Sequence, residues 1–270
     1  MSIFRKMMAF VKRDFRIRLS YKTSFILEWI SALTTVTTFY FVSKLVSQNA
    51  TTYLLEYQTG YFPFVLIGLV FSGYLNTALQ SFSSNIRNEQ LLGTLEAMLV
   101  SPIKIWLIVI GVSLWDFIFT TITAIISLLF GVLVFKVDLS QANLLAGLLI
   151  LVMTVIAFSS IGIISAAFVI ILKKGNPINW MIGTFTAFFG GVFFPFEMLP
   201  QSIRQVSYFL PMTYSLRGLR HAVLQGYSLR MLMPDIGMLI LFCAVLVPLS
   251  LWIFKKSVDK AKITGSLTHY

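Results

Sequence analysis

The sequence predicts an all-α integral membrane protein. We expect an N-terminal amphipathic interfacial helix, six transmembrane helices and a re-entrant helical hairpin before the sixth. Hydrophobic residues make up 57% of the chain and charged residues 11%, with a mean hydropathy of +0.86, whereas water-soluble domains carry about 25% charged residues. The apolar runs are long enough to cross a bilayer as helices, which takes about 20 residues, and they lack the short alternating segments of barrel strands.

Residues 3–19 are predicted to form a helix on the membrane surface. Apolar residues recur along one face at helical spacing, and basic residues lie mostly opposite, which is typical of interfacial helices. The apolar stripe comprises Ile3, Phe4, Met7, Met8, Val11 and Phe15, and the basic face comprises Arg5, Lys6, Lys12, Arg13 and Arg16. Such a helix either anchors the topology or offers a docking surface to a partner.

Six apolar runs follow, at residues 25–46, 61–86, 103–135, 142–172, 178–196 and 235–254. The third and fourth exceed a perpendicular crossing, because about 30 residues at 1.5 Å each reach roughly 45 Å. We expect them to tilt, kink or project into the cytoplasm. With the N-terminus inside, fifteen of the 21 Lys and Arg residues fall on inner segments and six on outer ones. The positive-inside rule therefore predicts that both termini are cytoplasmic.

The outer segment at residues 197–234 is too apolar for a free loop and too interrupted for a crossing. Pro200 and Pro211 divide it, so we expect two short helices that dip into the outer leaflet and pack against the spans. In the preceding run, Gly183, Ala187 and Gly191 recur every four residues. Small residues on one helix face permit close packing, within the chain or across a dimer.

The motifs of nucleotide binding and catalysis are missing. No glycine is followed by lysine, as a P-loop requires. Neither His221 nor His269 lies near a serine in a nucleophile turn, and HExxH does not occur. The net charge is +11, and the basic residues border the apolar runs. This placement indicates that they contact anionic lipid and not nucleic acid. We therefore expect no enzyme activity, cofactor or metal in this chain.

Two carboxylates, Glu28 and Asp116, lie within apolar runs. A charge at the centre of a span costs about 3 kcal/mol, so such residues normally face other helices or water. One interpretation is a cation or proton site. The other, which is favoured for Glu28 because it lies close to the cytoplasmic face, is a structural pair with a basic residue.

The segment NEQLLGTLEAMLVSP, residues 88–102, joins the second and third runs on the cytoplasmic side. Its pattern predicts a short amphipathic helix that ends at Pro102. The apolar residues expected on one side are Leu91, Leu92, Leu95, Met98 and Leu99. The carboxylates of Glu89 and Glu96 would be poorly placed against anionic headgroups, so contact with a protein is favoured over a helix resting on lipid.

Taken together, the whole chain resembles the membrane subunit of type-2 ATP-binding-cassette exporters, especially the drug-resistance, nodulation-factor and polysaccharide-export permeases. The resemblance depends on EQLLGTLEAMLVSP at residues 89–102 and FFPFEMLPQSIRQVSYFLPMTYSLRGLR at residues 193–220. The second motif contains Pro195, Pro200, Pro211, Tyr214 and Arg220. The resemblance implies that residues 88–100 form a coupling helix that docks in a groove of a separate ATPase subunit.

The residues that match the coupling motif are Glu89, Gly93, Thr94, Leu95 and Glu96. We expect the carboxylates to meet basic residues of the ATPase, Leu95 to fill a pocket there, and Gly93 to permit close backbone approach. The N-terminal helix would be the second contact, through Phe4, Arg5, Lys12 and Arg13.

The resemblance also implies a homodimer above two ATPase subunits, which would bind the ATP and Mg. The substrate path would follow the dimer axis in the plasma (inner) membrane of a prokaryote and carry an amphiphile such as a drug, lipid or glycolipid. Two other functions stay open at this point. One is a stand-alone ion-coupled transporter using Glu28 or Asp116, and the other is a non-transporting membrane scaffold.

Overall fold

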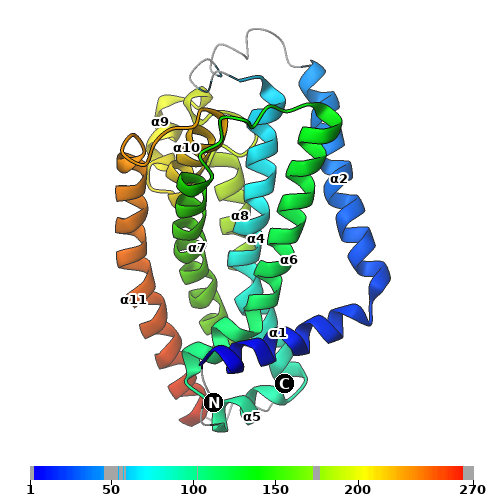
Figure 1. Cartoon of the computed structure of the whole chain (residues 1–270). Coiled ribbons are helices and arrows are strands. Elements are labelled where there is room, and N and C mark those ends of the chain that lie inside the picture. The colour runs from blue at the N-terminus through cyan, green and yellow to red at the C-terminus, as the bar shows by residue number, and fades with distance from the viewer. Residues whose placement is uncertain are drawn as a thin grey trace.

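The computed structural model describes all of the chain except residues 1–2, 46–53, 55–56, 58, 102, 173–176 and 264–270. The described residues form a bundle of long helices, with short helices at both ends (Figure 1). We call the end with α1 (Ile3–Leu19) and α5 (Thr94–Val100) the inner end, and the end with α9 (Gln201–Ser207) and α10 (Pro211–Leu224) the outer end. The predicted all-helical class is confirmed.

Five helices of the described chain are long and apolar enough to cross a membrane. They are α2 (Lys22–Leu45), α4 (Tyr61–Leu91), α6 (Ile105–Phe135), α7 (Leu144–Leu172) and α11 (Met233–Ile263). The lengths of α6 and α7, 31 and 29 residues, agree with the expectation of unusually long third and fourth helices. Helices α4 and α11 continue past the ends of their predicted apolar runs, at residues 86 and 254. The inner end of the bundle is therefore built partly from polar helical turns.

The sequence placed a further span at 178–196, but the structure has a shorter helix there. Helix α8 (Pro177–Phe189) has 13 residues, which is about 20 Å and less than the roughly 30 Å of a hydrocarbon core. The helix ends because the chain turns at Gly191, whose φ is 81°. Glycine adopts this left-handed conformation without steric cost. The count of six full-length spans is therefore not confirmed.

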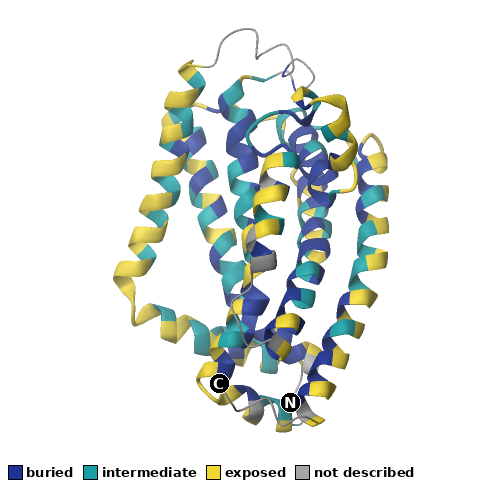
Figure 2. Ribbon diagram, turned by 180° about the vertical axis from the view of Figure 1, so that it is seen from behind, coloured by how far each residue is buried: buried dark blue, intermediate teal, exposed yellow. Residues whose placement is uncertain are grey.

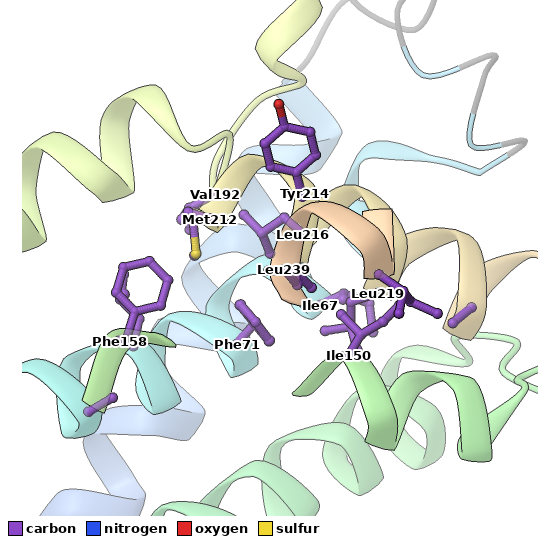
Figure 3. Close-up of a cluster of buried hydrophobic side chains, with 14 of the residues drawn as sticks. Ile67, Phe71, Ile150, Phe158, Val192, Met212, Tyr214, Leu216, Leu219 and Leu239 are labelled. Carbon is purple, nitrogen blue, oxygen red and sulfur yellow. The ribbon is translucent and has the colours of Figure 1, made fainter. Parts of the chain in front are cut away.

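Helix α4 lies at the centre of the bundle and packs against α6, α7 and α2. In the most apolar 18-residue stretch of α4, 61% is buried inside the protein, whereas in the corresponding stretch of α2 only 6% is buried (Figure 2). The main hydrophobic core lies toward the outer end, where α4, α7, α10 and α11 meet around Phe71, Ile150, Met212 and Leu239 (Figure 3). Helix α2 is consequently a loosely attached arm with most of its surface free.

The segment after α8 forms the short 3-10 helix η2 (Phe196–Met198) and then α9 and α10. Helix α9 follows Pro200 and helix α10 begins at Pro211, as the two prolines predicted. Proline suits the first helical turn because its missing N–H has no partner to lose there. Helix α10 packs against α7, α11 and α4, and this burial explains why its sequence is too apolar for a loop.

Candidate functional site

The inner end contains a compact knob made of the end of α4, the turn at Gly93 and helix α5. Gly93 has a φ of 68°, and its N–H donates to the carbonyl of Gln90 at 3.1 Å. This left-handed turn separates α4 from α5, so the predicted helix at 88–100 is two helical pieces. Pro102, expected to end the segment, lies outside the described residues. Helix α5 ends at Val100, and Ser101 is its C-cap.

Two of the predicted coupling residues point into the protein. The Leu95 side chain is 2% exposed and packs with Ile86 and Val258 in the core at the inner end. The Glu89 carboxylate lies 2.8 Å from the Arg13 guanidinium and also accepts a hydrogen bond from the Thr94 hydroxyl. The structure therefore differs from the expectation that Leu95 and Glu89 present their side chains to the ATPase.

The apolar side chains that do face outward are Leu91, Leu92 and Val100, which are 58%, 74% and 87% exposed. We call these three residues the inner apolar surface. The sequence grouped Leu91 and Leu92 with Leu95 on one face, but the break at Gly93 turns the two halves in different directions. The side chain of Glu96 lies outside the described part of the structure.

Helix α1 lies across the inner end and is held by an ion pair and by one buried ring. Arg13 contacts Glu89, as described above, and Asp14 at 2.7 Å. Phe10 is 8% exposed and packs on Ile108 and Val112 of α6. Sequence reasoning missed Phe10, although its three-residue spacing from Met7 was a signal. Phe4, Arg5 and Lys12, the other predicted contact residues, have exposed side chains.

Both intramembrane carboxylates pair with one arginine that sequence reasoning did not single out. Arg18 lies 3.0 Å from Asp116 and 3.4 Å from Glu28. Asp116 also accepts hydrogen bonds from Ser81 at 2.6 Å and from Asn85 at 2.8 Å. The structural-pair interpretation therefore describes Glu28 and Asp116 better than a vacant cation site does.

A polar groove of about 640 Å³ runs between α2, α4 and α6, and Arg18, Glu28 and Asp116 are among its lining residues. Its wall on α4 includes Ser72, Asn76, Gln80, Ser84 and Asn88, which follow one another at four-residue spacing. The last four of these residues are exposed. Polar groups at membrane depth normally face water or other polar groups. Sequence reasoning treated this run as an ordinary span and missed the stripe, although the spacing was readable.

The outer end is held together by Arg220, which is 2% exposed. Its guanidinium donates to the carbonyls of Phe64 at 3.2 Å, Gly191 at 2.8 Å and Val192 at 2.9 Å. It also lies 3.4 Å from the centroid of the Phe64 ring, which is a cation–π contact. Arg220 thus joins α10 to the start of α4 and to the turn after α8.

The remaining hairpin residues of the prediction have structural positions. Pro195 is buried before η2, Pro200 is exposed before α9, and Pro211 is buried at the start of α10. The Tyr214 hydroxyl donates to the carbonyl of Tyr208 at 3.0 Å and points away from the apolar core (Figure 3). These contacts fix the turn between α9 and α10.

The three small residues of the fifth run do not form one helical face. Gly183 lies on α8 next to Asn76 and Leu79 of α4, so it serves packing within the chain. Gly191 lies beyond the end of α8 in the left-handed turn, and nothing is described of the Ala187 side chain. The predicted stripe is therefore wrong beyond Phe189.

No group of three or more His, Cys, Asp or Glu residues within the described ranges is arranged to hold a metal ion. At the inner end, Arg13 of α1 pairs with Glu89 of α4, and Arg18 of α1 pairs with Glu28 of α2 and Asp116 of α6, so these ion pairs connect helices.

Comparison with known proteins identifies the architecture. The profile of the ABC-2 type transporter family matches residues 5–224, from α1 to the end of α10. The chain belongs to the ABC-2 type transporter family. It is thus the permease subunit of a type-2 ABC transporter, and the matched region includes residues 88–100, the polar groove, and helices α9 and α10.

Curated relatives support the same assignment. The chain is similar to the inner membrane transport permease YadH of Escherichia coli (strain K12), with 25% identity over 187 residues. The alignment covers 67% of this chain and 70% of YadH. The YadH proteins of Escherichia coli O157:H7 and Shigella flexneri match equally well.

Proposed function

We propose that this ABC-2 permease is the transmembrane half of an ATP-driven exporter in the plasma (inner) membrane of a prokaryote. In this proposal two copies form the substrate path, and each docks one copy of a separate ATP-binding-cassette ATPase. The ATPase subunits alone bind ATP and Mg, and both termini of the permease are cytoplasmic. Family membership supports the ATPase partner, and the similarity to inner membrane permeases supports the location.

The observation that carries the proposal is the inner apolar surface on a rigidly attached knob. Leu91, Leu92 and Val100 expose large side chains at the end of the protein that is predicted to lie in water. Apolar patches exposed on a protein surface mark sites of protein or membrane contact, and we assign these three side chains to a protein partner. Fully burying a Leu or Val side chain against a partner contributes about 1.5–3 kcal/mol of hydrophobic free energy.

The attachment of the knob gives it a means of transmitting movement. Leu95 fixes α5 to the core, while Glu89 connects the end of α4 to Thr94 of α5 and to Arg13 of α1. Displacement of α5 by an ATPase would therefore move α1 and α4 with it. Helix α4 carries the polar stripe, so nucleotide-driven movement would reach the wall of the polar groove directly.

The exposed surfaces near α4 support a homodimer with a path at its centre. Asn76, Gln80 and Ser84 on α4 would be costly against lipid, and a water-containing path satisfies them. Beside them, α8 exposes Met181 and Phe185, each with about half of its surface free. Apolar residues flanking a polar stripe are suited to seal a path between two copies, and the mixed lining suits an amphiphilic substrate.

The hairpin of α9 and α10 completes the proposal at the outer end. We place it as a re-entrant element that covers the outer mouth of the path. The anchoring of Arg220 to three backbone carbonyls supports this role, because non-helical backbone at membrane depth is stable only when protein satisfies it.

The test is co-purification with an ATPase. The chain is co-expressed with ATPase subunits encoded beside it, purified in nanodiscs and assayed for bound ATPase and ATP turnover. Leu92→Asp with Val100→Asp should abolish the complex, while Phe209→Asp, which changes an 81% exposed side chain at the outer end, should not. Normal binding and turnover by the Leu92/Val100 variant would contradict the proposal.

The ion-coupled alternative has its own test at Asp116. Asp116 already pairs with Arg18 and accepts hydrogen bonds from Ser81 and Asn85. Asp116→Asn should therefore reduce the stability of the protein and leave its coupling to the ATPase little changed. Loss of transport with ATPase stimulation intact would favour ion coupling instead. A partner that lacks ATPase activity would favour the scaffold.

A further inference from the structure

A second groove, separate from the polar one, lies between α6, α7 and α11. Its volume is about 1370 Å³, larger than the roughly 300–1,000 Å³ of pockets for drug-sized ligands. Helices α6 and α7 both pack on α4, and the groove is the space left between them, with Tyr74 and Phe82 of α4 among its lining. None of its lining residues belongs to the polar groove.

The walls of this groove are apolar and open toward the bilayer. Leu148 and Ile156 of α7 and Leu251 of α11 line it with 60%, 40% and 47% of their surfaces exposed. Along α6 the lining extends from Trp106 to Thr121, which is about 22 Å of helix. One leaflet of hydrocarbon is about 15 Å thick, so the groove is long enough to accept acyl chains from the inner leaflet.

The inner end of the groove differs from its walls because it carries two lysines. Lys104 precedes α6 and Lys255 lies in the inner part of α11, and both line the groove and are exposed. Neither forms an ion pair with a carboxylate in the described part of the chain. Asp259, one turn beyond Lys255, is not among the lining residues. Two unpaired ammonium groups beside an apolar groove complement a phosphate attached to two acyl chains.

We propose that this groove binds an anionic phospholipid of the inner leaflet, with its phosphate between Lys104 and Lys255 and its acyl chains between α6, α7 and α11. The charge at one end and the apolar lining along the rest favour a lipid over a soluble anion. The inference needs the membrane location of the chain but not its coupling to an ATPase. The bound lipid would fill the space between α6 and the α7–α11 pair and hold them at a fixed separation.

The experiment measures lipid retained by the full-length chain. The protein is reconstituted in nanodiscs of phosphatidylcholine with a minor fraction of phosphatidylglycerol, re-extracted in mild detergent, and analysed for bound lipid by mass spectrometry. The wild type should retain phosphatidylglycerol in preference to phosphatidylcholine. Lys104→Gln with Lys255→Gln should reduce that preference about 30-fold, since each lysine near an anionic headgroup contributes about 1 kcal/mol.

The matched control removes the same charge elsewhere. Lys22→Gln with Lys256→Gln changes two exposed inner-end lysines that do not line the groove, and it should keep the preference. A second variant, Val152→Trp, fills the groove from an exposed position of α7 and should displace the lipid with both lysines present.

The outcomes separate the possible sources of binding. Equal retention of phosphatidylglycerol by the Lys104/Lys255 variant and the wild type would overturn the proposal. So would an equal loss in the control, which would mean that general surface charge holds the lipid. Competition by free phosphate at concentrations that leave ionic strength unchanged would also overturn it, because an acyl-chain site does not release its lipid to a soluble anion.

Discussion

The ion pair between Arg13 and Glu89 should couple α1 to the knob by a measurable free energy. The two side chains meet at 2.8 Å, and that of Glu89 is only 10% exposed. A hydrogen bond to a charged group in such a site contributes about 1.5–3 kcal/mol net. By contrast, Arg18 and Glu28 meet at 3.4 Å with side chains 40% and 44% exposed, and such pairs contribute about 0.2–1 kcal/mol.

A double-mutant cycle tests this difference. Arg13→Gln, Glu89→Gln and the double variant are unfolded by SDS titration in mixed micelles, followed by circular dichroism. Arg13 also contacts Asp14, but that loss occurs in both the single and the double variant and cancels in the cycle. We expect a coupling free energy of about 1.5–3 kcal/mol, and less than about 1 kcal/mol for Arg18→Gln with Glu28→Gln.

The same variants connect stability to function. If Glu89 transmits the movement of α5, Glu89→Gln should lower substrate-stimulated ATP turnover while the ATPase still co-purifies, because the inner apolar surface is intact.

The double-mutant cycle has its own refuting result. The reasoning fails if the coupling free energies of the Arg13–Glu89 and Arg18–Glu28 pairs differ by less than about 0.5 kcal/mol, which is the usual error of additivity.

Three further tests, one of them with a control substitution, address other parts of the structure. Gly93→Ala should destabilise the protein by roughly 1–2 kcal/mol, because alanine is strained in the left-handed conformation of Gly93. The control Gly237→Ala, with nothing near the added methyl group, should be neutral or stabilising by up to about 1 kcal/mol. Equal effects of the two substitutions on the SDS unfolding midpoint would contradict this prediction. Arg220→Met should cost about 1–3 kcal/mol for each carbonyl left without a donor, and an unchanged midpoint would show that the arginine does not hold the hairpin. Burial raises the pKa of the Asp14 carboxyl, so the stability contributed by its protonated form is present at low pH and is lost as the pH rises through that pKa. Asp14→Asn should remove this pH dependence from melting temperatures measured between acidic and neutral buffer. An unchanged pH profile in the variant would contradict the prediction.

Composition and periodicity predicted the class of fold and most of its elements. Long apolar runs at α2, α4, α6, α7 and α11 permit few structures in a bilayer other than helices, because the backbone must satisfy its own hydrogen bonds there. Pro200 and Pro211 placed α9 and α10 correctly because proline restricts where a helix begins. These signals are local, so they can be read without knowing what each segment packs against.

The direction in which the site residues point was decided by the tertiary structure. The pattern around Gly93 predicted one amphipathic face, but the left-handed turn sends Leu92 outward and Leu95 into the core. The fifth apolar run was read as a span, yet its chain turns at Gly191 where Arg220, 29 residues later, supplies a donor. Contacts between residues so far apart in the chain leave no periodic signal.

Hydropathy and periodicity were enough to predict that this chain lies in a membrane, where its helices occur and which segment has the pattern of a docking helix. The fold decided which charges are paired, since the Arg18–Asp116 and Arg13–Glu89 contacts join residues 98 and 76 positions apart. It also decided that the polar face of α4 is exposed, while the space between α6 and α7 is apolar and ends in two lysines. Hydropathy depends on each residue alone, whereas pairing and exposure depend on which helices pack together.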